Sequence, residues 1–201
     1  MNIYTILSAC LAIYLYFVLR NQIRKGQTKQ NLATWLLWAT LDAIAVISLI
    51  IQQGNFLMVA AYTLGSFWIT IYIAKSGNFS WTKVETRVTI MVVICLIGWI
   101  LSGPRTATIL SSIAVVIAGE PQLRDTAKDP WSAPLPVYFG FFVANILSVI
   151  GAEDWSIEEA FYPSCCAVYC GVLVLIAMRK FWLQKPVLVP DFSDLSSYKF
   201  T

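Results

Sequence analysis

Long apolar segments separated by short polar or charged stretches dominate this sequence of 201 residues. Seven such segments stand out, at roughly 3–19, 32–51, 56–74, 84–101, 105–120, 132–150 and 158–178. A helix of about 20 apolar residues crosses a bilayer, so each segment is long enough to cross, although the fifth is short. We therefore predict an all-α integral membrane protein with seven transmembrane helices.

The interruptions between these segments contain residues that end or begin helices. Residues 52–55 (Gln-Gln-Gly-Asn) form a polar turn, and Gly103 with Pro104 stops a helix. Ser156 and Glu159 have the spacing of a capping box, which predicts the start of the last helix. None of these breaks has the composition of a domain linker.

The composition excludes several classes of protein. Apolar residues make up 58% of the chain and charged residues 12%, which excludes a soluble globular protein and a disordered chain. The absence of histidine removes His-based metal sites, proton relays and Ser-His-Asp catalysis. The five cysteines fall within apolar stretches without metal-site spacing, and we interpret them as small buried hydrophobes. We therefore predict neither an enzyme nor a metal or other cofactor.

The basic residues are distributed very unevenly between the predicted loops. Thirteen of the 14 lysines and arginines follow the first, third, fifth or seventh segment, and only Arg105 falls on the other side. Cytoplasmic loops carry the excess of Lys and Arg in membrane proteins. We therefore predict an outside N-terminus and a cytosolic C-terminus, in the plasma (inner) membrane.

An internal repeat emerges when the sequence is shifted by 100 residues. The first three segments then align without gaps on the last three, with Ser48 on Ser148 and Tyr62 on Tyr162 among the matches. Two groups of three helices share one orientation only if an extra helix re-inverts the chain between them. Parallel repeats of this kind are typical of secondary transporters. The predicted divisions are a first triple-helix unit at 1–75, an inverting linker helix at 76–103, a second triple-helix unit at 104–180 and a cytosolic tail at 181–201.

Together with the Pro121-Gln122 pair at the cytosolic end of the fifth segment, this three-plus-one-plus-three plan resembles the PQ-loop superfamily, which includes the SWEET (MtN3) sugar transporters and the KDEL receptors. The resemblance covers about residues 1–180. It implies that substrate passes between the two units by alternating access, with Gln22, Pro121 and Gln122 as gate or hinge residues at the inner ends. The first unit departs from the pattern, because Asn21 stands where the second unit has Pro121.

Asp42 is the single acidic residue deep inside a predicted span. A charge near the bilayer centre costs roughly 2.5–3.5 kcal/mol on insertion scales, so such a residue is a functional candidate by default. We expect Asp42 to face a cavity, where it could couple transport to protons. The alternative is a protonated side chain that bonds a neighbouring helix as structural glue.

Two tryptophans share a helical face with this acid. Trp35, Trp38 and Asp42 recur at i, i+3 and i+7, so they follow one face from the cytosolic end to the middle of the span. An aromatic platform leading to a carboxylate suits a sugar, a nucleoside or a cationic amine. The alternative is interfacial anchoring for Trp35 and core packing for Trp38.

Other polar side chains within the spans complete the predicted substrate site. The Asn145 amide suits a hydroxylated substrate, with an interhelical hydrogen bond as an equal alternative. Tyr62 and Tyr162 occupy matching positions and form either a paired outer gate or an aromatic lining. Ser66 and Cys166 follow deeper on the same helices.

Acidic residues gather before the last span, at Glu153, Asp154, Glu158 and Glu159. Acids at a helix N-terminus complement its dipole, which is a sufficient structural explanation. Attraction of cationic substrates is the functional alternative.

These features predict a membrane transporter of a small polar organic solute, such as a sugar, an amino acid or a vitamin-like molecule. The alternative is a seven-helix receptor or sensor that binds a ligand without transport. The expected partners are a small-molecule substrate and the lipid bilayer, with a homo-oligomer left open and no nucleic acid.

Overall fold

The computed structural model describes residues 2–28, 30, 32–75, 81, 83–131 and 133–183, and within these ranges the chain forms helices and no strand. Most of the predicted tail, residues 184–201, lies outside the described residues. So do three of the basic residues used for orientation, Lys29, Lys185 and Lys199. The α-helices are α1 (Ile3–Arg24), α2 (Leu32–Ile51), α3 (Leu57–Ala74), α4 (Lys83–Ser102), α5 (Pro104–Ala118), α6 (Glu120–Lys128), α7 (Leu135–Ile150) and α8 (Tyr162–Met178). A π-helical turn, Ile157–Phe161, precedes α8, and a 3-10 turn, Arg179–Phe181, follows it.

By length and composition the chain is that of a membrane-embedded helical protein. Five described stretches are long and apolar enough to cross a membrane: Ile3–Arg24, Leu32–Ile51, Leu57–Ala74, Pro104–Lys128 and Ile157–Phe181. Two shorter apolar stretches accompany them, Thr86–Ser102 within α4 and Leu135–Ile150, which is α7. The count of seven spans therefore stays a prediction.

The outer surface of the bundle is strongly apolar. Ile100 is 84% exposed, and Leu64, Val168 and Leu175 are exposed at 68%, 68% and 67%. Large contiguous apolar surface is rare on soluble monomers and is typical of contact with lipid or a partner. The exposed face therefore agrees with the apolar lengths of the helices.

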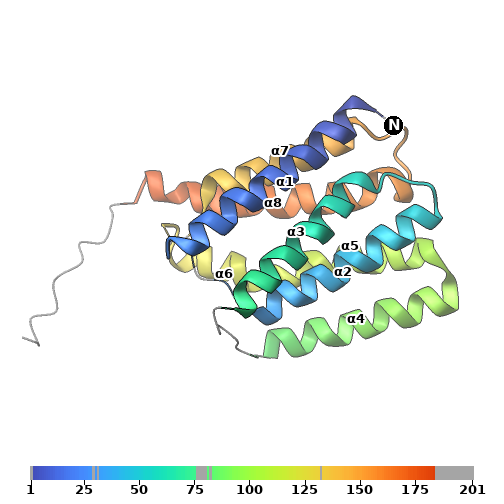
Figure 1. Cartoon of the computed structure of the whole chain (residues 1–201), viewed down its shortest axis with the longest axis horizontal. Coiled ribbons are helices and arrows are strands. Elements are labelled where there is room, and N and C mark those ends of the chain that lie inside the picture. The colour runs from blue at the N-terminus through green and yellow to red at the C-terminus, as the bar shows by residue number, and fades with distance from the viewer. Residues whose placement is uncertain are drawn as a thin grey trace, which may run out of the picture.

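Successive long helices run in opposite directions, so the connections alternate between two ends of the bundle (Figure 1). One end carries Arg24, Lys75 and Lys128 and is called the basic end. The other carries Glu153 and Asp154, between α7 and the π-turn, and is called the acidic end.

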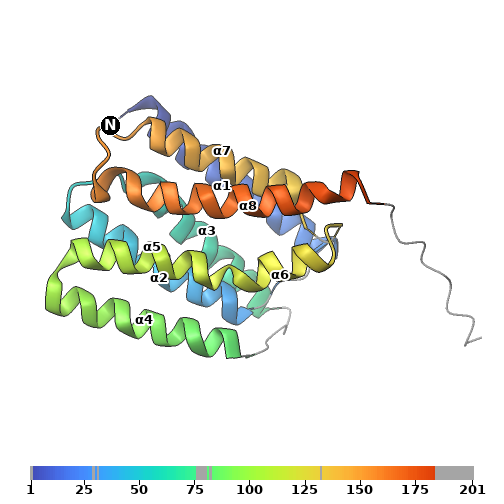
Figure 2. The same cartoon turned by 180° about the vertical axis from the view of Figure 1, so that it is seen from behind.

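The helices pack in two connected groups. Helix α3 contacts both α1 and α2, and α8 contacts both α7 and α5. The groups meet where α1 packs on α7 and α2 packs on α5. Helix α4 lies at one side of the bundle, against α5 and α2 (Figure 2).

The fifth predicted segment does not form one uninterrupted α-helix. Helix α5 ends at Ala118, Gly119 follows, and α6 begins at Glu120. Pro121 has no N–H to bond the carbonyl of Ile117, so the regular pattern cannot continue through this point. The proposed hinge residue Pro121 therefore lies at the junction of α5 and α6, which Figure 2 shows as a bend.

The predicted capping box before the last helix is wrong. The Ser156 side chain makes no capping bond, and the Glu159 carboxylate instead accepts a hydrogen bond from the N–H of Glu153 at 3.2 Å. The chain enters this helix through the π-turn, directly before Pro163 in the first turn of α8. Because proline cannot donate and its ring crowds the carbonyl four residues earlier, a wider turn relieves the clash at this point.

Candidate functional site

A cavity of about 70 Å³ lies between the helices near the middle of the bundle. Helices α1, α2, α3, α5, α7 and α8 all contribute side chains to its wall, whereas no described residue of α4 does. Of the eight predicted substrate-binding residues, the cavity brings together Trp35, Trp38, Asp42, Tyr62, Ser66, Tyr162 and Cys166. Residues from both halves of the sequence therefore share one site.

Asp42 is 3% exposed and both of its carboxylate oxygens accept hydrogen bonds. The Tyr162 hydroxyl donates to Oδ1 at 2.5 Å, and the Ser66 hydroxyl donates to Oδ2 at 3.2 Å. The Tyr16 hydroxyl lies 3.1 Å from the Ser66 oxygen and extends this network to α1. The carboxylate thereby links α2 to α8 and α3, and through Ser66 to α1.

The charge of this carboxylate has no basic neighbour among the described residues of the cavity wall. The described lining residues include no lysine or arginine, and the ion pairs of the described chain do not involve Asp42. A buried ionised group without a partner is costly, whereas hydroxyl donors offset only part of the lost hydration. The site therefore favours either a proton or a cation at Asp42.

Aromatic rings form much of the wall around the acid. The Tyr16 ring makes edge contacts with Phe141, Trp35 and Tyr62 at centroid distances of 5.2, 6.2 and 6.2 Å. The Trp35 and Trp38 rings are perpendicular, with centroids 5.2 Å apart. Such edge-to-face pairs are a preferred aromatic geometry, so the wall is well packed.

Both indole N–H groups are occupied within the protein. Trp35 donates to the Gln30 side-chain oxygen at 2.8 Å, and Trp38 donates to the Val115 carbonyl at 3.3 Å. Trp35 is only 4% exposed, so it is part of the interior. The two tryptophans therefore offer the cavity ring surface and no unpaired donor.

A close approach on α3 makes room for the Tyr16 ring. A Cβ atom at Gly65 would lie 2.1 Å from the ring atom Cδ2 of Tyr16. Real Cβ atoms do not come so close, and the clash involves a ring that other aromatic side chains hold in place. Gly65 therefore allows Tyr16 to lie beside Ser66.

Asn145 does not line the cavity and lies behind its wall. Its side-chain nitrogen donates to the Tyr62 hydroxyl and to the Phe141 carbonyl, both at 2.7 Å, and the residue is fully buried. This is the interhelical bond that the sequence offered as the alternative role. Tyr62 and Tyr162 both line the cavity but bond different partners, Asn145 and Asp42.

The three predicted gate or hinge residues lie away from the central cavity. Gln122 lines a separate cavity of about 500 Å³ at the basic end, together with Gln27 and Lys128, and its amide donates to Thr126 at 3.3 Å. The side-chain oxygen of Gln22 is buried and has no hydrogen-bond partner. Pro121 precedes Gln122 at the α5–α6 junction.

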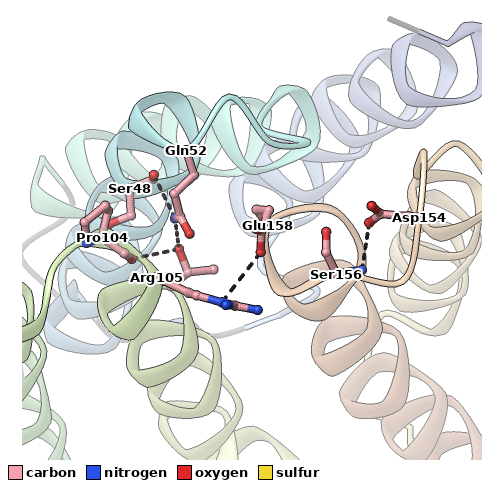
Figure 3. Close-up of polar contacts among 8 residues, drawn as sticks. Ser48, Gln52, Pro104, Arg105, Asp154, Ser156 and Glu158 are labelled. Carbon is pink, nitrogen blue, oxygen red and sulfur yellow. Dashed lines mark hydrogen bonds and ion pairs between the residues drawn. The ribbon is translucent and has the colours of Figure 1, made fainter.

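Polar contacts join the two helix groups at the acidic end. The Asn55 amide donates to the Ser148 carbonyl at 3.1 Å and to the Ser148 hydroxyl at 3.2 Å. The backbone N–H of Asn55 donates to the Glu158 carbonyl at 3.0 Å. Figure 3 shows Gln52 at this end, where its amide donates to Thr108 at 2.8 Å, and Arg105 paired with Glu158 at 3.8 Å. Side chains from both helix groups therefore hold the acidic end of the bundle together.

Seven lining residues were missed by sequence reasoning: Tyr16, Leu19, Val115, Tyr138, Phe141, Tyr169 and Cys170. Tyr138 lies 100 residues after Trp38, so the internal offset could have found it. Tyr169 follows Tyr162 by seven positions and Cys170 follows Cys166 by four, which places them on the same helical face. Leu19 and Val115 carry no such signal.

The described residues contain no group of three or more His, Cys, Asp or Glu side chains that could hold a metal ion. Comparison of the chain with protein-family models, curated proteins and solved structures gave no match. The chemistry of the central cavity is therefore the starting point for a functional proposal.

Proposed function

We propose that the protein is a membrane transporter of a small polar organic solute, which it moves by alternating access between two triple-helix units. The central cavity carries this proposal, because six helices from both halves of the chain surround one buried carboxylate. Ligand sites between the helices of a bundle are typically apolar and aromatic, with a few polar groups that orient the ligand. The wall around Asp42 has this composition.

The helix contacts support the division into two units. Under the 100-residue offset, α1, α2 and α3 correspond to α5, α7 and α8. The contacts of α3 with α1 and α2 then match those of α8 with α5 and α7. The contact of α1 with α7 likewise matches that of α5 with α2, as a two-fold arrangement requires. This pattern agrees with the PQ-loop resemblance and with α4 as a linker helix.

Matched positions of the proposed repeat meet in the cavity. Trp38 and Tyr138, Tyr62 and Tyr162, and Ser66 and Cys166 are each separated by 100 residues, and all six side chains line it. A substrate site on the axis between parallel repeats receives equivalent positions from both. The central cavity therefore has the location that such a transporter needs.

The two ends of the bundle differ in a way that supports alternating access. The acidic end is crossed by the Asn55 and Gln52 bonds and holds a cavity of about 180 Å³, whereas the cavity at the basic end is larger, at about 500 Å³. The central cavity, at about 70 Å³, is far below the roughly 300–1,000 Å³ of ordinary ligand sites. Substrate entry therefore requires the two units to separate.

Coupling to protons is part of the proposal. The described groups that face Asp42 are the hydroxyls of Tyr16, Ser66 and Tyr162 and the thiol of Cys166, and no basic side chain is among the described lining residues. A proton on Asp42 would remove the uncompensated charge when the cavity is empty. In the proposed orientation, the basic end faces the cytosol.

Flux measurements test the proposal. The purified protein, reconstituted into liposomes, is expected to admit at least one member of a panel of radiolabelled sugars, amino acids and amines, with saturation at high concentration. Protein-free liposomes are the control. Saturable binding without any flux would identify a receptor instead, and chemical conversion of the ligand would identify an enzyme.

A further inference from the structure

We propose that the central cavity selects a small organic monocation, a quaternary or protonated amine, over neutral solutes of the same shape. This inference rests on the proposed transport function and names its substrate class. It depends on three properties of the cavity: an uncompensated acid, an aromatic wall and few unpaired hydrogen-bonding groups.

The acid is arranged as an ionised group that lacks a counter-charge. Both oxygens of Asp42 accept hydrogen bonds, from Tyr162 and Ser66. Hydroxyl donors on both oxygens suit a carboxylate, which only accepts. Since the described residues of the wall include no lysine or arginine, the positive charge that would balance Asp42 must enter from outside.

The rings around the acid suit a cation that carries methyl groups. The small cavity that contains Asp42 is also lined by five aromatic side chains whose rings contact one another edge to face: Tyr16, Trp35, Trp38, Tyr62 and Phe141. Aromatic faces attract cations through their quadrupole, and aromatic cages are a recurring means of binding quaternary ammonium groups. A compact cation therefore meets a favourable surface on several sides.

The same wall is poorly equipped for a sugar. A polyhydroxyl ligand needs many donors and acceptors, because each of its buried polar groups must be paired. The indole N–H groups of Trp35 and Trp38 are already bonded within the protein. The Tyr162 and Ser66 hydroxyls are engaged by Asp42, and the Tyr169 hydroxyl donates to the Gly119 carbonyl at 3.1 Å. Among the described lining residues, the hydroxyls of Tyr62 and Tyr138 can still donate to a ligand, which is fewer groups than a polyhydroxyl molecule needs.

The acidic end offers a route that would concentrate cations. A cavity of about 180 Å³ there has Glu153 and Glu159 among its lining residues, and no lysine or arginine among those that the structure describes. Arg105 at this end is paired with Glu158. Clefts lined by one sign of charge raise the local concentration of the opposite ion. This feature favours cation entry once the Asn55 contacts open.

A charge-matched pair of ligands tests selectivity on the unaltered protein. Choline and 3,3-dimethylbutan-1-ol share a shape, but only choline carries a positive charge. We expect choline to bind at least about tenfold more tightly, measured by calorimetry and by intrinsic tryptophan fluorescence, to which Trp35 and Trp38 of the cavity wall contribute. Equal binding of the two ligands, or binding of neither, would overturn the inference.

Two variants locate the binding at Asp42. Asp42→Asn is expected to abolish the difference between choline and its neutral isostere, whereas Asp125→Asn, an exposed acid at the basic end, is expected to preserve it. If Asp42→Asn fails to fold, Tyr162→Phe retains the acid and is expected to weaken choline binding selectively. Preferential choline binding that survives Asp42→Asn would place the site elsewhere and overturn the inference.

Flux separates this inference from the proposed function. Choline uptake into liposomes supports both. Choline binding without flux supports the cation site and overturns transport. Flux of neutral solutes with no binding of choline supports transport and overturns the cation site.

Discussion

The two proposed units contribute different chemistry to a single cavity. Both units supply phenols, but among the described lining residues the one acid, Asp42, and both tryptophans come from α2, whereas the phenyl ring and the thiols come from α7 and α8. The prolines are equally one-sided, because none occurs before Pro104. The comparison suggests that the first unit carries recognition, and that the second supplies partners to the acid and a bend at Pro121.

The largest effect is expected where the units differ most, at Asp42, whose counterpart under the offset is the apolar Phe142. Asp42→Asn keeps the shape and the bond from Tyr162 but removes the charge. Uptake of the transported solute is expected to fall about 100-fold or more. The variant has no carboxylate at this position that could release a proton and bind the substrate in its place.

The pH dependence of uptake sharpens this prediction. If Asp42 exchanges a proton for a cation, uptake by the unaltered protein rises as the pH on the side of entry rises, because protons compete less. The Asp42→Asn variant is expected to show no such dependence. The comparison uses the residual uptake of the same substrate by the variant. If that uptake depends on pH as it does in the unaltered protein, Asp42 is not the group that exchanges a proton for the substrate.

Smaller effects are expected at the matched tyrosines, because Tyr162 bonds Asp42 whereas Tyr62 bonds Asn145. Tyr162→Phe removes a hydrogen bond to Asp42, worth about 1.5–3 kcal/mol for a charged group, so substrate affinity is expected to fall about tenfold or more. Tyr62→Phe removes the acceptor for Asn145. It is expected to lower the free energy of unfolding by about 1 kcal/mol, with little effect on substrate affinity. Equal effects of the two variants on affinity would show that the units are not specialised.

The sequence predicts a helix or a site residue well where its polarity differs clearly from that of the neighbouring residues. The bounds of α2 at 32–51 follow directly from its apolar run, and Asp42 stands out because an acid is conspicuous there. Tyr16 and Phe141 are aromatic residues in aromatic-rich apolar spans, so nothing marks them before the helices are packed. Their positions depend on tertiary contacts such as the space left at Gly65.

The missed features of the helices have a similar origin. Hydropathy does not distinguish an α-helix from a π-turn, so the entry into α8 was predicted as an ordinary capped start. The turn depends on Pro163 and on the chain around it, including the Asn55 N–H that bonds the Glu158 carbonyl. The capping box at Ser156 was locally reasonable, but the Glu159 side chain turns to Glu153.

The smallest effect is expected from making the second unit resemble the first at the bend. Pro121→Asn copies Asn21, which lies within an uninterrupted α1, and restores an N–H that can bond the Ile117 carbonyl. One such bond is worth about 0.5–1.5 kcal/mol, enough to change the balance between two conformations by about two- to tenfold. Because Pro121 does not line the central cavity, the uptake rate is expected to change while ligand affinity is retained. Pro104→Ala is the matched control, since a proline at the first position of α5 interrupts no helical bond and its removal should leave the rate unchanged. If Pro121→Asn and Pro104→Ala both transport at the original rate, the bend between α5 and α6 is a static feature, and the difference between the units is confined to the cavity wall.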